Sequence, residues 1–321
     1  MNRKKWVVLL IVLTVFVSGI VVEGIYGEPS AWTNQPEVSW EETVVSGAGD
    51  SKIVQLFVTG VISGGQTNTV SPPMTDLLAE QMRRIEEDEQ VKAVVLRIDS
   101  PGGEVVATDE IHQRLLHLKS VRNIPLVVSM GSTAASGGYY LATAGDAIFA
   151  NPNTITGSLG VIFTLINFGE AASRFGIKQY AIKSGRFKDI GSPARPLTDA
   201  ERNIFQSLVN ESYQNFVDVI VRGRKLPRKR VLQIADGRIY SGEQAKRLGL
   251  IDQFGDLEKA TAHALSLSGE EEARIVRYAE NFSIEHLLFS LQKYWSNPDP
   301  LGLNRFWEGQ SSPRLLYQYM P

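Results

Sequence analysis

Residues 93–103 read Ala93-Val94-Val95-Leu96-Arg97-Ile98-Asp99-Ser100-Pro101-Gly102-Gly103. The first six residues are mostly apolar and partly β-branched, which is typical of a buried strand, and the glycine pair indicates a tight turn after it. Apolar residues at helical spacing follow, from Val105 to Lys119. The stretch therefore predicts a strand, a glycine turn and a helix, the unit from which parallel sheets are built.

The same alternation recurs along the chain. Further strands are predicted at 53–58, 125–130, 147–150 and 179–182. Further helices are predicted at 74–88, 139–144, 198–222, 228–234, 242–248 and 257–267. Thr198 and Glu201 have the spacing of a capping box at the start of the longest helix. Strands alternating with helices predict an α/β fold with a parallel sheet covered by helices.

The composition excludes several classes of protein. The chain has 321 residues, of which 43% are hydrophobic, so it can form a real core. Its net charge is −2 and its pI about 6.2, which offers no basic surface for a nucleic acid. It has no cysteine, which rules out disulfides, thiolate metal sites and a lipid-modified cysteine.

The N-terminus indicates a membrane segment. Three basic side chains in residues 1–5 precede Trp6 to Val22, a run without any charge. Spanning a bilayer takes roughly 17–25 such residues, and flanking basic residues stay in the cytoplasm. We therefore expect an anchor over residues 1–27, with the rest of the chain outside the cytoplasm. A cleaved signal peptide is the alternative. Residues 28–50 are expected to form a linker.

A serine stands among small residues in Ala134-Ala135-Ser136-Gly137-Gly138, between a predicted strand and a predicted helix. At such a helix N-terminus the amide of Gly137 is free to donate a hydrogen bond, and Ser136 is either a nucleophile or a helix cap. None of the four histidines lies in a glycine-rich context, so the sequence gives little support for a serine–histidine–aspartate mechanism.

The turn at 99–103 could supply a second backbone donor, because glycines expose their N–H groups at the start of a helix. A simple strand–helix turn is the other interpretation. It is not a phosphate loop, since no Gly-Lys-Ser/Thr follows.

A candidate base is Lys188, in Ser184-Gly185-Arg186-Phe187-Lys188-Asp189. A lysine serves as a base only when its ammonium is partly buried, because burial favours the neutral amine. Lys178 and Lys183 remain alternatives on sequence alone. Ser158, in Thr156-Gly157-Ser158-Leu159-Gly160, is either a turn residue or a hydroxyl that orients the lysine.

Taken together, these segments resemble the signal peptide peptidase A family of membrane-anchored bacterial serine proteases, in its short, single-repeat form. The resemblance runs from the anchor to about residue 270. The motifs that carry it are Asp-Ser-Pro-Gly-Gly at 99–103, Ala-Ala-Ser-Gly-Gly-Tyr-Tyr at 134–140, Thr-Gly-Ser-Leu-Gly-Val at 156–161, Ser-Gly-Arg-Phe-Lys-Asp at 184–189 and Tyr-Ser-Gly-Glu-Gln-Ala at 240–245.

This resemblance implies a ClpP/crotonase-like fold of repeated ββα units over residues 51–270, with 271–321 as a C-terminal extension. It implies that Ser136 is the nucleophile, Lys188 the base, the Gly103 and Gly137 amides the oxyanion hole, and Ser158 a partner of the lysine. The expected activity is cleavage of remnant signal peptides and other apolar peptides at the membrane. No metal or cofactor is expected. The chain is expected to assemble into a homo-oligomeric ring.

Two other functions fit the same fold. A crotonase-type acyl-CoA enzyme would need an acid/base carboxylate in place of the serine–lysine pair, and a non-catalytic scaffold would need neither residue. The apolar C-terminal segment, Leu315-Leu316-Tyr317-Gln318-Tyr319-Met320, suits an extended peptide in a protease groove. We expect it to dock in an active site and to be trimmed there, with a disordered end as the alternative.

Overall fold

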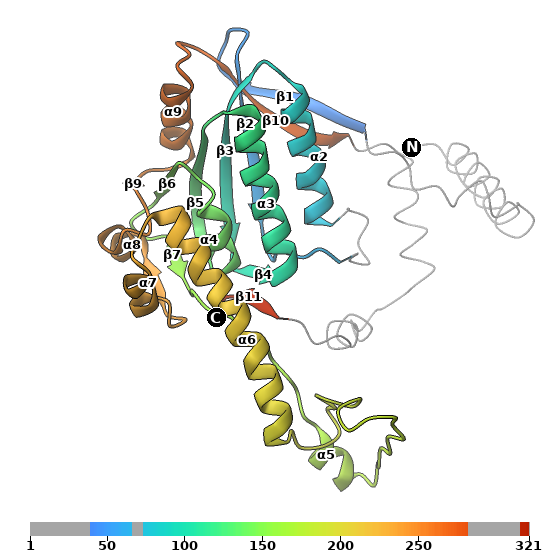
Figure 1. The fold of residues 1–321 in the computed structure, drawn as a ribbon. Coiled ribbons are helices and arrows are strands. Elements are labelled where there is room, and N and C mark those ends of the chain that lie inside the picture. The colour runs from blue at the N-terminus through green and yellow to red at the C-terminus, as the bar shows by residue number, and fades with distance from the viewer. Residues whose placement is uncertain (1–38, 66–72, 282–314, 321) are drawn as a thin grey trace, which may run out of the picture.

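The computed structural model describes residues 39–65, 73–281 and 315–320. In this part of the chain a nine-stranded, mostly parallel sheet has the order β1-β10-β2-β3-β5-β6-β9, with β7 beside β5 and β8 beside β7 (Figure 1). Its strands are β1 (Ser39–Ser46), β2 (Lys52–Thr59), β3 (Val91–Ser100), β5 (Leu126–Ala135), β6 (Ala147–Ala150), β7 (Ile155–Gly157), β8 (Ile239–Ser241), β9 (Gln253–Phe254) and β10 (Arg274–Asn281). Two short strands, β4 (Gly102–Glu104) and β11 (Leu316–Gln318), form a separate antiparallel pair.

Helices cover both faces of the sheet. The described helices are α2 (Met74–Glu87), α3 (Val105–Arg122), α4 (Gly137–Ala142), α5 (Gly169–Arg174), α6 (Asp199–Arg224), α7 (Arg228–Ile234), α8 (Gly242–Leu248) and α9 (Leu257–Ser268). One buried cluster joins the sheet to α2, α3, α4 and α6, and a second joins the other face to α9. The expected α/β fold with a mostly parallel, helix-covered sheet is confirmed.

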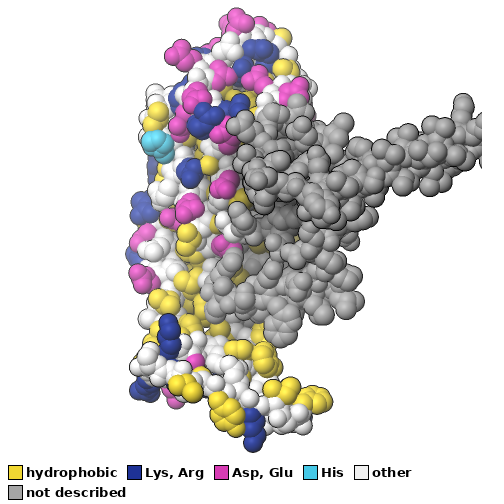
Figure 2. All heavy atoms as spheres, turned by 90° about the vertical axis from the view of Figure 1, so that its right-hand side faces the viewer, with side chains coloured by type: hydrophobic (Ala, Val, Ile, Leu, Met, Phe, Trp, Pro, Cys, Tyr) yellow, Lys and Arg dark blue, Asp and Glu magenta, His cyan; other side chains and the backbone are white. Residues whose placement is uncertain are grey.

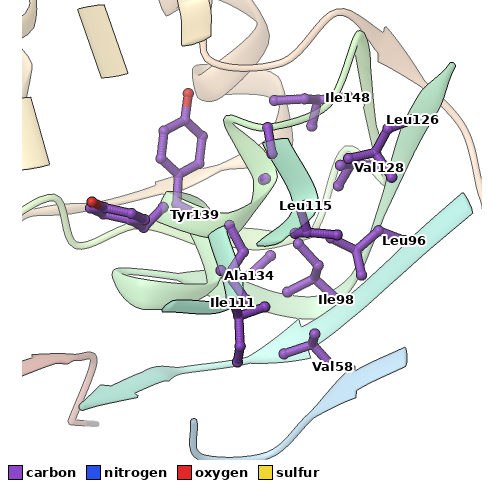
Figure 3. Packing of buried hydrophobic residues seen from close by; sticks show 14 of the residues in the cluster. Val58, Leu96, Ile98, Ile111, Leu115, Leu126, Val128, Ala134, Tyr139 and Ile148 are labelled. Atoms are coloured by element: carbon purple, nitrogen blue, oxygen red, sulfur yellow. The ribbon is translucent and has the colours of Figure 1, made fainter. Parts of the chain in front are cut away.

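The central strand β3 shows why the sheet is continuous and apolar. Leu96 and Ile98 project into the cluster with Ile111 and Leu115 of α3 (Figure 3), while Val95 belongs to the cluster under α9. Both faces of β3 are therefore covered. A strand covered on both faces has a nearly unbroken apolar sequence instead of an alternating one.

Two strands of the sheet come from outside the range 51–270 expected for the domain. β1 lies within the expected linker and pairs antiparallel with β10, and β10 lies within the expected C-terminal extension and pairs parallel with β2. Polar residues on an edge strand such as β1 face solvent, so its composition resembles that of a linker.

The strand predicted at 179–182 does not form; these residues are irregular and exposed, with Tyr180 82% and Ile182 105% accessible. They lie far from the sheet, where they have no neighbouring strand to pair with. The helix predicted at 139–144 begins earlier, at Gly137, and ends at Ala142.

The expected anchor over residues 1–27 lies outside the described residues. Within the described ranges, none of the helices combines the length and the apolar character that crossing a bilayer requires.

The end of α6 is fixed to the sheet by an ion pair. Arg224 donates two hydrogen bonds to the Asp252 carboxylate, at 2.9 and 2.7 Å, and that carboxylate also accepts the N–H of Ile148 at 2.8 Å. The Arg224 side chain is only 7% exposed. Its guanidinium therefore depends on this partner.

We predict that Asp252→Ala lowers the free energy of unfolding by about 2–4 kcal/mol, because it leaves a buried guanidinium unpaired. Denaturant titration measures the change. The matched control is Glu170→Ala, which removes an ion pair between side chains that are 76% and 83% exposed and should cost at most about 0.5 kcal/mol. Equal losses of unfolding free energy in the two variants would contradict the stabilising role assigned to the ion pair between Arg224 and Asp252.

Candidate active site

Ser136 lies at the point where β5 ends and α4 begins. Its φ is +53°, a conformation that a residue other than glycine rarely adopts and that costs on the order of 1–3 kcal/mol. Its N–H donates to Gly157 O at 2.8 Å, which holds the turn against β7. The side chain is 1% exposed, and its Oγ has no hydrogen-bond partner within the described residues. A strained, buried and unpartnered hydroxyl is poorly explained by stability alone.

The glycine turn after β3 lies directly against this serine. Gly102 has a φ of +96°, and a Cβ placed on it would lie 2.6 Å from Gly137 N. The Ser100 hydroxyl accepts the Gly102 N–H at 3.0 Å and shapes the turn. On its outer side β4 is bonded to Ile62, whose N–H donates to Gly102 O and whose carbonyl accepts from Glu104 N, both at 2.9 Å. The turn is thereby held within contact of the start of α4.

The C-terminal segment lies in this site as an added strand. β11 pairs antiparallel with β4, with Leu316 opposite Glu104, Tyr317 opposite Gly103 and Gln318 opposite Gly102. On the other edge, Leu316 exchanges two hydrogen bonds of 3.0 Å with Ile162. Figure 1 shows β11 next to β4 below α4. A peptide bonded along both edges is bound as proteases and other β-augmenting domains bind extended ligands. The C-terminal segment is therefore docked as a strand beside the candidate site, and its trimming stays a prediction.

The carbonyl of Tyr317 lies over the glycines. A Cβ on Gly102 would stand 1.9 Å from Tyr317 O, and a Cβ on Gly137 would stand 3.1 Å from it. Tyr317 is also the residue opposite Gly103 in the ladder. The carbonyl therefore lies among the backbones of Gly102, Gly103 and Gly137, where the sequence predicted an oxyanion hole.

Lys188 is not brought to Ser136 within one chain. It lies in an extension that we call the arm (residues 163–198), which includes α5 and ends where α6 begins. Figure 1 shows the arm at the far end of α6, away from β5 and α4. Lys188 is exposed, and no hydrogen bond joins it to Ser136 or to Ser158 in the described residues. Ser158 instead follows β7 with a φ of +51° and donates its N–H to Arg238 O at 2.7 Å.

No metal site accompanies these residues: the described ranges contain no group of three His, Asp or Glu side chains that could hold an ion.

Comparison with known proteins identifies the family. The model of peptidase family S49 matches residues 119–269, and that of Clp protease matches residues 52–156. A protein of Enterococcus faecium, named "Putative signal peptide peptidase SppA", is 33% identical over 293 residues, which are 87% of this chain and 85% of that protein. This chain belongs to peptidase family S49. It is a serine protease of that family.

Two further relatives of this S49 peptidase are also proteases by name. "Putative protease slr0021" of Synechocystis is 39% identical over 68% of this chain and 75% of its own length. "Protease 4" of Haemophilus influenzae is 31% identical over 73% of this chain but only 37% of its own length. The Clp protease match agrees with the helix-covered, mostly parallel sheet.

The segment of the S49 peptidase that carries Lys188 is held by a network of charges. Arg195 bonds to both Asp189 and Glu201, at 2.9 and 2.5 Å, and Lys183 bonds to Asp189 at 2.5 Å. The hydrogen bonds from Arg195 hold the pKa of the Glu201 carboxyl at about 2, and they hold that of Asp189 well below its usual range, with Lys183 contributing. The residue next to Lys188 is therefore fixed to the base of α6.

Sequence analysis missed the aromatic residues around the docked strand. Tyr140 of α4 and Phe216 of α6 both pack on Tyr317, and the Tyr140 hydroxyl donates to Asp109 at 2.6 Å. Behind them His112 is buried, which lowers its pKa to about 4 and keeps it neutral at pH 7. The nearest signal in the sequence is the Tyr139-Tyr140 pair after the glycines, but aromatic residues in a helix usually indicate core.

We predict that Gly102→Ala lowers activity by at least about 100-fold. The new Cβ would stand 1.9 Å from the carbonyl of a strand bound over the glycines and 2.6 Å from Gly137 N, so a substrate strand could not bind there in the same position. Peptide hydrolysis measures it. Gly237→Ala is the matched control, since Gly237 has a similar φ of +91° with nothing within 4 Å of a Cβ. Gly237→Ala should lose only the roughly 1–3 kcal/mol of its backbone strain. Gly102→Ala should lose more stability, because its Cβ would also overlap two backbone atoms, and it alone should lose activity. Full activity in Gly102→Ala would place the reaction elsewhere.

We also predict acid sensitivity from the network. In the folded chain the pKa of Glu201 is about 2, below its usual value of 4.5. As pH falls, the unfolded chain therefore takes up a proton at this residue before the folded chain does. The free energy of unfolding should therefore decrease between about pH 4.5 and pH 2, and Arg195→Met should flatten this dependence. Denaturation midpoints measured across that range test it. Arg174→Met removes only an exposed ion pair and should follow the wild type. Parallel curves for Arg195→Met and wild type would refute the network's role.

Proposed function

We propose that this S49 peptidase is a membrane-anchored serine endopeptidase that degrades remnant signal peptides and other apolar peptides. Ser136 is its nucleophile and Lys188 its base, and the base comes from a second copy of the chain. The proposal rests mainly on one observation. The C-terminal segment is bound as a β-strand with a carbonyl among three glycines, beside a serine hydroxyl that has no hydrogen-bond partner in the described ranges.

The reaction follows from this arrangement. The neutral amine of Lys188 accepts the proton of Ser136 Oγ, which attacks the carbonyl carbon over the glycines. Negative charge then develops on an oxygen near the Gly103 and Gly137 amides, and each such donor contributes roughly 2.7–4 kcal/mol to transition-state binding. The lysine gives its proton to the leaving amine, and water hydrolyses the acyl-enzyme. Apart from the water that hydrolyses the acyl-enzyme, these steps use only side chains and backbone amides of the site.

A second copy is proposed because of the arm. Lys188 lies away from the serine of its own chain, and Ser136 Oγ has no hydrogen-bond partner among the residues that the structure describes. The arm also exposes large apolar side chains, among them Phe175, 84% accessible, and Ile177, 64% accessible. Figure 2 shows hydrophobic side chains gathered at the lower end of the molecule, which carries the arm. Contact with another copy would cover this surface. It would also remove water from the lysine, which favours the neutral amine.

The substrate class and the location rest on other grounds. The uncharged run at 6–22 supports an anchor with the protease domain outside the cytoplasm. The name of the Enterococcus relative points to signal peptides. Such peptides have apolar cores, and a site that binds main chain along both edges accepts them in extended form.

The test is complementation between two inactive variants. Ser136→Ala and Lys188→Ala should each lose nearly all hydrolysis of an apolar peptide. Co-expressed in equal amounts, they should regain about a quarter of wild-type activity. A site is complete when its serine comes from one variant and its lysine from the other, and each condition holds in about half of the cases in a closed symmetric assembly.

The control lysine is Lys178, which lies exposed on the same arm. Lys183 is unsuitable because it is paired with Asp189. Lys178→Ala should retain wild-type activity. Inactive mixtures of the two variants would refute the second copy's contribution. Full activity in Lys188→Ala alone would refute the dyad.

A further inference from the structure

The loop that carries Lys188 is closed by its own contacts. Lys188 N donates to Gly185 O at 3.1 Å, and Lys183 Nζ bonds to the Asp189 carboxylate at 2.5 Å. The two members of this ion pair stand on either side of Lys188 in the chain, so the pair joins both ends of the loop. Residues 183–189 belong to no helix or strand, and the loop therefore lacks the ladder of backbone hydrogen bonds that fixes a regular element.

A single arginine connects this loop to α6. Arg195 donates to both oxygens of the Asp189 carboxylate, at 2.9 and 3.0 Å, and to the Asp189 carbonyl at 3.1 Å. On its other side it donates to both oxygens of the Glu201 carboxylate, at 2.9 and 2.5 Å. A planar guanidinium suits two such forked contacts, which an ammonium cannot make. The residue next to Lys188 is therefore held by both its side chain and its main chain.

The other end of this connection is firmly placed. Glu201 stands in the first turn of α6, where Thr198 donates to its carboxylate through the backbone N–H and the hydroxyl, both at 2.9 Å. The Glu201 side chain is 3% exposed. A buried carboxylate that loses its cationic partner is costly, so Arg195 stays bound to it. Further along, α6 packs into the main core cluster through Phe216 and Ile220.

The connection bears on the reaction because a base must be placed precisely. To accept the proton of Ser136, Lys188 has to come within about 3 Å of a hydroxyl that belongs to another copy. A misplacement of about 1 Å can lower a rate by about 100-fold. A loop outside the regular elements reaches such precision only when other side chains hold it.

We propose that Arg195, bonded to Asp189 and Glu201, is a positioning residue for the catalytic lysine. It fixes the Lys188 loop relative to α6, so that the lysine reaches Ser136 of a second copy. Arg195 acts through Lys188 and takes no part in the proton transfer itself. This inference rests on the proposed function and adds a residue of the arm on which that reaction depends.

The first experiment is kinetic and uses the full chain. Arg195→Met should lower kcat for an apolar peptide by about 100-fold and leave KM near the wild-type value, because β4 and Ile162 still bind the main chain of the substrate. Arg195→Lys should also remain impaired, since an ammonium cannot bond both carboxylates as a fork. Arg174→Met removes only an exposed ion pair of the same arm and should keep both constants. Wild-type kcat in either Arg195 variant overturns the proposal.

The second experiment separates positioning from a loss of stability. Ser136→Ala and Lys188→Ala chains are co-expressed, so each complete site takes its lysine from the Ser136→Ala chain. Adding Arg195→Met to that chain should lower the activity of the mixture by about 100-fold. Adding it to the Lys188→Ala chain should leave the activity of the parent mixture, because the altered arm then carries no working lysine. Both mixtures contain the same share of altered arms, so equal activities in the two overturn the proposal.

The parent mixture separates this inference from the proposed function. If the parent mixture is active and the two Arg195→Met mixtures are equal, the positioning role is overturned and the proposed function stands. An inactive parent mixture, or full activity in Lys188→Ala alone, overturns the proposed function and this inference with it.

Discussion

The close approach of two backbone segments underlies the site. The turn at Gly102 and the start of α4 at Gly137 are so near that a Cβ on either would meet the other segment, 2.6 Å from Gly137 N in one case and 3.1 Å from Gly102 Cα in the other. Only glycine permits this contact, and only this contact brings amides of two different strand–helix units to one point. The strained turn at Ser136 lies beside it. The parallel strands β3 and β5 deliver both segments to the same edge of the sheet.

The docked strand shows how that edge receives a peptide. β4 supplies one side and Ile162 the other, so the peptide's main chain is bonded independently of its sequence. The side chain of Tyr317 packs on Tyr140 of α4 and Phe216 of α6, and α6 is connected to the arm through the charges at its first turn. The contact with the docked strand and the position of Lys188 thus depend on one helix.

In the proposed assembly, one chain supplies the nucleophile and the glycine amides, while the lysine of the same chain lies in the arm, away from them. This division explains the apolar surface of the arm, which is costly for a free monomer and favourable when covered. It also accounts for the Ser136 hydroxyl, which has no hydrogen-bond partner in the described part of the chain. In the proposed assembly, the partner of Ser136 arrives only with another copy.

Much of the fold could be predicted from local pattern. The β-branched runs of β3 and β5 and the helical periodicity of α2 and α3 identify the parallel sheet and its covering. The capping box at Thr198 and Glu201 forms as predicted, with Thr198 Oγ1 accepting from Glu201 N at 3.3 Å. The predicted strand at 179–182 failed because pairing depends on a neighbour, and local alternation carries no information about neighbours.

The candidate site likewise has one part that could be predicted from the sequence and another part that could not. The sequence by itself determined where the glycine turn, the serine between small residues and the apolar C-terminal segment lie. Each of these features depends on local backbone freedom or local chemistry. Tertiary structure alone decided that β1 and β10 belong to the sheet, that Tyr140 and Phe216 enclose Tyr317, and that Lys188 stands apart from Ser136. Those relations join residues far apart in the chain, and long-range packing places them.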